Sequence, residues 1–148
     1  MCGRYAFSDI DEIYEARRIL EEVAQRLGDE QAAAVKTGEV FPTECAAVVA
    51  QRPEGARAEA MRWGYPLSGK LLINARSETA AEKPAFRAAF RSRRCIVPAD
   101  GFYEWQQQPS GKQPFYIHRK DGQLLAMAGL WEHWMPPGAT EPLLTFTI

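Results

Sequence analysis

The sequence has few of the residues with which small domains hold metal ions or close disulfides. Its 148 residues include two histidines and three cysteines. The cysteines, Cys2, Cys45 and Cys95, are odd in number and widely spaced, so they predict neither a disulfide framework nor a C-x-x-C metal pair. We therefore expect a protein of a reducing compartment that needs no metal ion and no cofactor.

The sequence also lacks a long apolar run, a secretion signal and a large net charge. No stretch reaches the roughly 18 apolar residues of a membrane span, and the start lacks the basic-then-apolar pattern of a signal peptide. The formal net charge is −1, and no internal repeat or low-complexity tract is visible. A chain of this length suits one domain with its own core. We expect a soluble, cytoplasmic protein without membrane contact.

Charged residues are unevenly distributed, although they nearly cancel. Acidic side chains crowd residues 9–22, and basic side chains crowd a later segment: Lys83, Arg87, Arg91, Arg93 and Arg94. A basic cluster of this kind fits the phosphates of a nucleic acid, but it also fits the solvated face of a helix. The cluster alone leaves both interpretations open.

Short apolar segments separated by turn residues predict a fold rich in strands. Apolar residues at helical spacing predict a helix over 10–27, and Pro84 opens a short basic helix to about residue 92. Strands are expected at 44–50, 58–63, 71–74, 95–97, 101–105, 115–119, 124–131 and 143–148. The sum is an α+β fold: mainly antiparallel strands forming a twisted sheet or open barrel-like core with two or three flanking helices.

The start of the chain, Met1-Cys2-Gly3-Arg4, places a cysteine at the second position. If Met1 is removed, Cys2 carries a free α-amine and a thiol on adjacent carbons. Such a 1,2-aminothiol condenses with an aldehyde, because the amine forms an imine and the thiolate closes on it as a thiazolidine ring. Both groups are partly nucleophilic near neutral pH, and we expect Arg4 to favour the thiolate further. On position alone, the simpler interpretation is that Cys2 merely follows the start codon.

Four segments occur together, namely CGRY at 2–5, MRWGY at 61–65, NARSET at 74–79 and ADGFYEW at 99–105. In this order they resemble the SOS-response-associated peptidase (SRAP) family over essentially the whole chain. That family shields abasic sites in single-stranded DNA, and its N-terminal cysteine forms a thiazolidine with the ring-opened sugar aldehyde. The resemblance implies that Cys2 is this nucleophile. It also implies a covalent DNA–protein cross-link that protects the lesion during the SOS response to DNA damage.

The resemblance assigns roles to two further residues of the active site. Asn74 matches an asparagine that orients the amine or donates to the sugar oxygen. Glu104 matches a catalytic glutamate, a general acid and base that opens the sugar and dehydrates the carbinolamine. Without the resemblance, Asn74 is as well explained by backbone hydrogen bonds at a strand end, and Glu104 by an outward-facing strand carboxylate.

DNA-binding residues are implied in the same way. Arg4 and Arg76 match arginines that bind backbone phosphates, although each can instead pair with a carboxylate such as Glu78. Trp63 and Pro42 match positions that stack on bases or wedge beside them, although such residues are more often part of a core or a loop. Single-stranded DNA with abasic sites is therefore the expected partner. We expect the protein to be monomeric and associated with the nucleoid, and the sequence does not identify its partners in replication.

Two features depart from the family pattern. Segment 66–70 is short and holds no second tryptophan. The family continues past the equivalent of Ile148 to a histidine that assists proton transfer, whereas His118 and His133 lie outside that context and are expected at the surface. Strand 143–148 ends without a polar tail, so we expect it to be exposed. We expect residues 1–148 to form a single domain that lacks its C-terminal part and part of its catalytic set.

Two other functions use the same residues. In an N-terminal-nucleophile cysteine peptidase, a hydrolase, the Cys2 thiolate attacks an amide carbonyl and the α-amine acts as the base. A non-catalytic fragment would only bind single-stranded DNA, and it would retain intact and abasic strands equally. A covalent adduct with an aldehyde would indicate the cross-linking, lyase-like activity. An acyl-enzyme formed with an amide would instead indicate the peptidase, and the absence of any covalent adduct would indicate the non-catalytic fragment.

Overall fold

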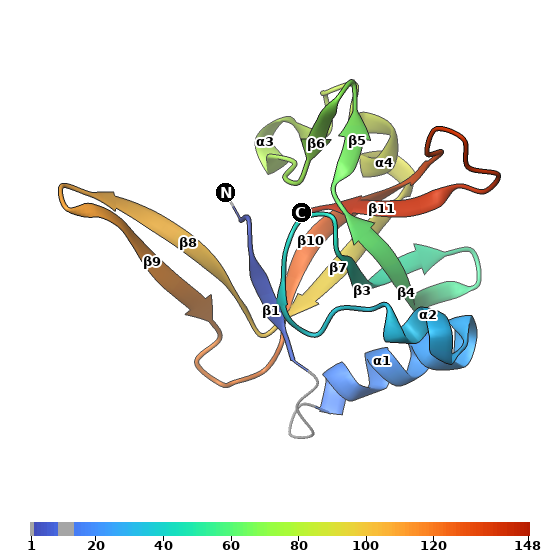
Figure 1. The fold of residues 1–148 in the computed structure, drawn as a ribbon, viewed down its shortest axis with the longest axis horizontal. Coiled ribbons are helices and arrows are strands. Elements are labelled where there is room, and N and C mark those ends of the chain that lie inside the picture. Colours follow the sequence, from blue (N-terminus) through green and yellow to red (C-terminus); the bar gives the residue numbers. More distant parts are fainter. Residues whose placement is uncertain (1, 9–13) are drawn as a thin grey trace.

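The computed structural model describes residues 2–8 and 14–148, which contain four helices and eleven strands (Figure 1). The helices are α1 (Tyr14–Leu27), α2 (Asp29–Ala33), α3 (Ser77–Ala80) and α4 (Arg87–Ser92). The strands are β1 (Tyr5–Phe7), β2 (Gly38–Val40), β3 (Cys45–Arg52), β4 (Gly55–Trp63), β5 (Tyr65–Leu67), β6 (Lys70–Leu72), β7 (Arg94–Ala99), β8 (Gly101–Gln108), β9 (Gly111–His118), β10 (Leu125–Trp134) and β11 (Leu143–Thr147). The first residues of the helix expected at 10–27, residues 10–13, lie outside the described residues.

Five strands close into a barrel in the order β10-β11-β4-β3-β7, and β7 pairs back onto β10. All neighbouring pairs are antiparallel except β11 and β4, which run parallel. A two-residue turn joins β3 to β4, because Arg52 lies opposite Gly55. Gly55 has a φ of 120°, a conformation that glycine adopts without the steric cost of a side chain.

The main hydrophobic core fills the barrel. Trp63, Phe146 and Val97, from three of its strands, are each 0% exposed. The ring of Trp63 is stacked on that of Phe146 with centroids 6.3 Å apart, and Tyr5 of β1 tilts against it at 5.2 Å. Burying one such side chain stabilises a fold by roughly 1.5 to 3 kcal/mol. The core therefore continues from the barrel to β1, the strand that follows Cys2.

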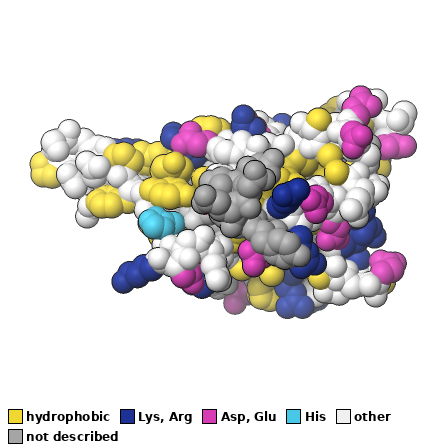
Figure 2. All heavy atoms as spheres, turned by 90° about the horizontal axis from the view of Figure 1, so that it is seen from below, with side chains coloured by type: hydrophobic (Ala, Val, Ile, Leu, Met, Phe, Trp, Pro, Cys, Tyr) yellow, Lys and Arg dark blue, Asp and Glu magenta, His cyan; other side chains and the backbone are white. Residues whose placement is uncertain are grey.

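A second sheet has the order β2-β1-β8-β9, with all neighbours antiparallel. Its long β8–β9 hairpin projects away from the barrel on the left of Figure 1. Every residue of β9 is exposed, and hydrophobic side chains gather along this projecting end (Figure 2). The exposed side chains of β9 include Phe115, Tyr116 and Ile117, which are 41–48% exposed.

The helices cover the outside of the barrel. On α1, Ala16 and Val23 lie two turns apart on one face and are both 0% exposed, and this helix contacts β3 and β4. The Glu22 side chain of α1 accepts a hydrogen bond of 2.9 Å from the backbone N–H of Ala58. The short helix α4 contacts β7 and β10 on another side. None of the helices in the described residues is both long and apolar enough to cross a membrane.

The predicted α+β class with mainly antiparallel strands is confirmed. Three details differ from the prediction, the first being that the described residues form four helices and not two or three. The barrel is closed, because the parallel β4–β11 pair links segments far apart in the sequence. The expectation of an exposed last strand is wrong, because β11 pairs with β10 on one side and with β4 on the other. The backbone of Ile148, beyond β11, also bonds to Ile73 and Ala75.

Candidate active site and nucleic-acid interface

Cys2 lies just before β1 and is held by short contacts. Its side chain is 7% exposed, and its Sγ donates a hydrogen bond of 3.4 Å to the backbone carbonyl of Arg4. The Nδ2 of Asn74 donates a hydrogen bond of 2.8 Å to the Cys2 carbonyl. Two residues 72 positions apart, both singled out in the sequence, therefore meet in the structure.

The position of Asn74 follows from the backbone around it. Asn74 lies in the loop between β6 and α3. On one side of it, the Ile73 carbonyl accepts hydrogen bonds from the indole Nε1 of Trp63 and from the Ile148 N–H, at 3.0 and 3.2 Å. On the other side, the Ala75 N–H donates to the Ile148 carbonyl at 2.6 Å. These bonds tie the Asn74 loop to the barrel, so its amide is presented to Cys2 from a fixed frame.

Glu104 comes from the projecting sheet. It lies in β8 opposite Phe115 of β9, and strand alternation places its side chain on the face opposite to those of Tyr103 and Trp105. The negative charge of Glu104 acts on the Cys2 thiol and raises its pKa. The structure thus brings the three residues Cys2, Asn74 and Glu104 into one neighbourhood.

The surroundings of the Cys2 thiol disfavour its ionisation. Burial raises its pKa above the usual value, and the Glu104 carboxylate raises it further. The hydrogen bond with the Arg4 backbone lowers this pKa, in the direction that favours the thiolate, but burial is the larger effect and the net shift is upward. Burial also raises the pKa of Cys45, and it raises that of Cys95 to about 12. The other two thiols are thus poorly suited to act as nucleophiles near neutral pH.

Arg4 is occupied by a carboxylate and by aromatic rings. Its Nη1 lies 3.5 Å from Oε1 of Glu39, which is the ion-pair partner in place of the suggested Glu78. Its guanidinium lies 4.9 Å from the ring centroid of Phe41 and 5.3 Å from those of Tyr103 and Trp105. The pKa of Tyr103 is raised by desolvation and by its hydrogen bond to Glu39. Arg4 therefore holds β2 to β8 in this structure.

The two other surface candidates, Arg76 and Pro42, lie in different loops. Arg76 precedes α3, is exposed, and pairs with no carboxylate among residues 2–8 and 14–148. Pro42 is partly exposed and follows β2 in a tight loop, where the Phe41 N–H bonds to the Glu44 side chain at 2.8 Å. Both are accessible to a large ligand.

Trp63 does not lie where a base can stack on it. Its side chain is 0% exposed, its indole N–H is bonded to Ile73, and its ring packs between Tyr5 and Phe146. The interpretation of Trp63 as a stacking surface is therefore corrected to a core residue. Its sequence neighbourhood matched the family, but residue type alone does not reveal burial.

The histidines and the acidic residues form no metal centre within the described ranges, because no group of three or more potential ligands occurs there. His118 and His133 are both exposed, as expected. His118 stacks on Tyr116 with centroids 5.5 Å apart, and His133 contacts the ring of Trp131.

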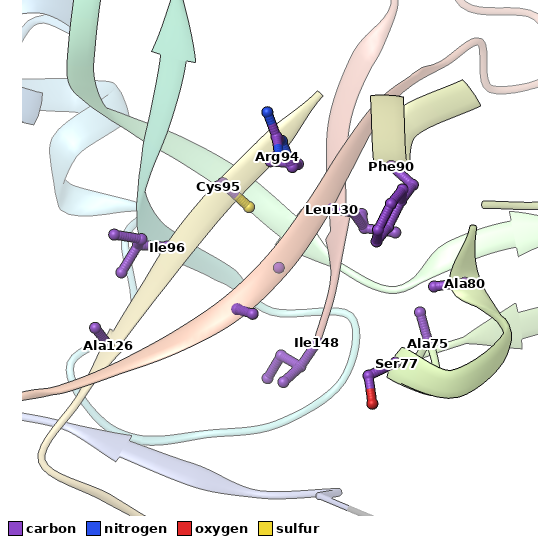
Figure 3. A pocket seen from close by; sticks show the side chains of 12 residues that line it. Ala75, Ser77, Ala80, Phe90, Arg94, Cys95, Ile96, Ala126, Leu130 and Ile148 are labelled. Carbon is purple, nitrogen blue, oxygen red and sulfur yellow. The ribbon is translucent and has the colours of Figure 1, made fainter. Parts of the chain in front are cut away.

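An apolar pocket of about 350 Å³ lies between β7, β10, α3 and α4 (Figure 3). Ala75, Ile148 and Leu130 line it, with the Cys95 sulfur at its side. The only charged lining residue is Arg94, and none of the proposed catalytic side chains reaches it. We assign no chemical step to this pocket.

Sequence reasoning missed the residues that hold Arg4. Glu39 lies in β2 and Phe41 directly follows it. A strand of three residues is too short to show the alternation of apolar and polar residues by which strands are predicted. It also missed Thr43, a residue with a φ of 78°, because strained backbone is not visible in a sequence.

The sequence is similar to those of known proteins. The sequence model of the family described as "SOS response associated peptidase (SRAP)" matches residues 1–148. Abasic site processing protein YoqW of Bacillus subtilis is 38% identical over 157 residues, covering 100% of this chain and 67% of that protein. Abasic site processing protein YedK of Escherichia coli is 35% identical over 133 residues, covering 88% of this chain and 59% of that protein.

A solved structure of a protein from Bacteroides thetaiotaomicron shares the fold. It matches with a TM-score of 0.75 at 22% identity, over 99% of this chain and 67% of that one. The chain thus spans about two thirds of the length of such relatives.

Proposed function

The chain belongs to the SOS response associated peptidase (SRAP) family, and from this we propose that it processes abasic sites in single-stranded DNA through a covalent bond to Cys2. Curated relatives of 35–38% identity are named abasic site processing proteins, which supports the substrate. The observation that carries the proposal is the contact of Asn74 with Cys2 beside the charge of Glu104. The Asn74 amide thus contacts the backbone of the residue whose thiol feels the Glu104 charge.

The chemistry follows from the 1,2-aminothiol. After removal of Met1, the α-amine of Cys2 adds to the sugar aldehyde and gives a carbinolamine, which loses water to form an imine. The sulfur then adds to the imine carbon, its proton passes to the nitrogen, and a thiazolidine closes. The net change is the loss of one water. Holding both nucleophiles in one residue makes ring closure intramolecular, an advantage of up to roughly 7 to 11 kcal/mol in well-oriented systems.

Each neighbouring side chain has a step that suits its chemistry. Because its pKa is raised, the Cys2 thiol must lose its proton as it attacks, and the Glu104 carboxylate is the nearby group that can accept it. In the preceding dehydration step, the same carboxyl group can give a proton to the departing hydroxyl of the carbinolamine, which leaves the carboxylate that then takes up the thiol proton. Asn74 fixes the Cys2 backbone through the 2.8 Å bond and so orients the amine.

Non-covalent binding would precede this chemistry. Arg76 is exposed and has no carboxylate partner in the described ranges, and Arg87 and Arg91 of α4 are exposed as well. We infer that Arg76 and this basic helix bind phosphates, with Pro42 beside the lesion, while Arg4 positions the sheet that carries Glu104. The peptidase alternative is less well supported, because burial, reinforced by the Glu104 charge, disfavours the Cys2 thiolate that would attack an amide.

The decisive experiment is the intact mass of the protein after incubation with a single-stranded oligonucleotide that bears one abasic site. We expect the mass of the chain without Met1 plus the oligonucleotide minus one water. Cys2→Ala should abolish this adduct, while the matched variant Cys45→Ala should retain it. Borohydride should trap a persistent imine but leave the thiazolidine unchanged. An adduct in Cys2→Ala, or equal reactivity of protein that retains Met1, would overturn the mechanism.

A further inference from the structure

A groove of about 530 Å³ lies where the ends of β4 and β10 meet the β5–β6 hairpin, beside the loop of Pro42. We call it the Arg62 groove. Six of its lining residues matter here: Thr43, Arg62, Leu67, Lys70, Trp134 and Met135. Its lining includes two cations and no carboxylate. Its volume falls in the range of sites for small molecules.

The two cations of the groove are not neutralised within the described residues. Arg62 Nε donates to the Thr43 carbonyl at 3.2 Å, which orients the guanidinium and leaves both Nη groups without a partner there. Lys70 is exposed and likewise pairs with no described carboxylate. By contrast, Arg52, Arg57 and Arg93 elsewhere on the barrel each contact a glutamate. An anion is therefore the missing partner of the groove.

The backbone at the lip of the groove is strained. Thr43 has a φ of 78°, a region that β-branched residues rarely adopt. Its N–H donates to the Trp63 carbonyl at 2.8 Å, and its own carbonyl accepts from Arg62. The surrounding bonds hold Thr43 in this conformation, and strain of this kind clusters at functional sites. Because Thr43 follows Pro42 in the sequence, its hydrogen bond with Arg62 places the Arg62 side chain beside the Pro42 loop.

The opposite wall is apolar and open. The Arg62 guanidinium lies 5.8 Å from the ring centroid of Trp134, which is partly exposed. Met135 and Leu67, which also line the groove, are 53% and 48% exposed, so this wall offers apolar surface to a ligand. The turn at Ser68 and Gly69 carries small residues, so nothing bulky closes the mouth.

We propose that the Arg62 groove binds one nucleotide of the single strand beside the lesion. Arg62 and Lys70 bind its phosphate, and its base lies against Trp134 and Met135. A ligand with a flat apolar ring and an anion matches the two kinds of wall, and base stacking on an aromatic side chain tolerates any sequence. This inference rests on the proposed function, because it places the DNA strand that Cys2 would attack.

The charge arm of the test measures binding without chemistry. Cys2→Ala protein is titrated with an intact oligonucleotide of thymidines at several salt concentrations. Adding Lys70→Gln or Arg62→Gln should reduce the log–log salt slope by about 0.7 and weaken binding roughly five- to tenfold at about 50 mM salt. The matched control is Arg26→Gln, an exposed cation in the last turn of α1, which should leave the slope unchanged. Thermal melts of all variants show whether each is folded.

The stacking arm uses tryptophan fluorescence. Trp63 and Trp131 are 0% and 4% exposed, so in a Trp105→Phe background Trp134 is the accessible tryptophan. Thymidine oligonucleotides should quench this emission, whereas a sugar–phosphate oligomer without bases should bind without quenching. Trp134→Leu should remove the quenching, and Lys70→Gln, at the exposed start of β6, should shift it to higher DNA concentration.

The outcomes separate the two proposals. Unchanged salt slopes in both charge variants, or quenching that needs no bases, would overturn the groove proposal. So would the absence of any binding by the Cys2→Ala parent. If the unmodified chain still forms its adduct in those cases, the proposed function stands. If no adduct forms but the groove variants behave as expected, the chain binds single strands and the covalent mechanism fails.

Discussion

The barrel and the β8–β9 hairpin both consist of strands that carry aromatic residues, but these side chains are far more buried in the barrel. In the barrel, Trp63 and Phe146 are 0% exposed, whereas in the hairpin Trp105 and Phe115 are 37% and 48% exposed. The barrel closes on itself, while β9 is an edge strand of the described sheet and pairs only with β8 there. The barrel therefore holds most of the stability, and the hairpin contributes little beyond its link through β1.

The candidate site combines both regions. Asn74 is fixed to the barrel through Ile73 and Ala75, and Cys2 precedes β1, which pairs with β8. Glu104 lies on the hairpin. Reactivity should consequently depend on the hairpin, and stability on the barrel, so that changes in the two regions can be told apart.

The largest effect is expected for Glu104→Gln. Loss of the carboxylate should slow adduct formation by roughly 10²- to 10⁴-fold, the usual contribution of a general acid–base group, with little change in the melting temperature. The matched control is Gln106→Ala, two residues along the same strand and on the same face. Time courses with abasic DNA measure the rates. Equal rates for parent and Glu104→Gln would show that the hairpin supplies no proton transfer.

The next effect compares two tryptophans. Trp63→Ala should lower the free energy of unfolding by about 3 to 5 kcal/mol, because it leaves a cavity in the barrel core. Trp105→Ala removes a partly exposed ring that contacts Arg4, and it should cost only about 1 to 2 kcal/mol. Urea unfolding of both variants measures the difference. Similar losses would contradict the view that the barrel holds most of the stability.

The strands of the barrel were predictable because they are long and apolar. The expected strands at 44–50, 95–97 and 124–131 correspond to β3, β7 and β10, although each ends at a different residue. The elements missed, β1, β2, β5, α2 and α3, have three to five residues, too few to show a period. Local patterns also could not reveal that β11 pairs with β4, so the last strand was wrongly expected to be exposed.

The site was predictable in its members but not in its contacts. The motifs singled out Cys2, Asn74 and Glu104, and the structure brings them together, while their reactivity stays a prediction. Trp63 was misjudged because an aromatic residue serves a core or a surface equally well. Arg4 was assigned to phosphates from the family resemblance, and its ion pair with Glu39 could not be foreseen, because the two residues are 35 positions apart and only folding brings them together.

A smaller effect is expected from the buried ion pair of the barrel. Glu59 is 7% exposed and accepts hydrogen bonds from Arg52 Nε and Arg57 Nε at 2.7 and 2.6 Å. Burial opposes its ionisation, but these bonds outweigh burial and lower its pKa below the ordinary 4.5. Glu59→Gln leaves Arg52 without its partner and should cost roughly 2 to 3 kcal/mol near neutral pH.

The pH dependence of that cost has a definite sign. Because the folded pKa of Glu59 is depressed, its stabilisation is fully present above the unfolded value and is lost as the pH falls through the folded value. The difference in unfolding free energy between parent and Glu59→Gln should therefore shrink below about pH 4.5. A constant difference between pH 7 and pH 3 would contradict the assignment of the shift to the ion pair.

The smallest effect is expected from the exposed ion pair beyond the hairpin. Asp121 accepts bonds of 2.9 and 2.5 Å from Arg119, and these lower its pKa to about 2. Its geometry is as good as that of Glu59, yet both side chains face water, where salt screens the attraction and holding the two side chains costs entropy. Asp121→Asn should therefore leave the unfolding midpoint unchanged at pH 7 and at pH 3. A loss as large as that of Glu59→Gln would mean that the segment after β9 is part of the cooperative core, and the distinction between barrel and hairpin would fail.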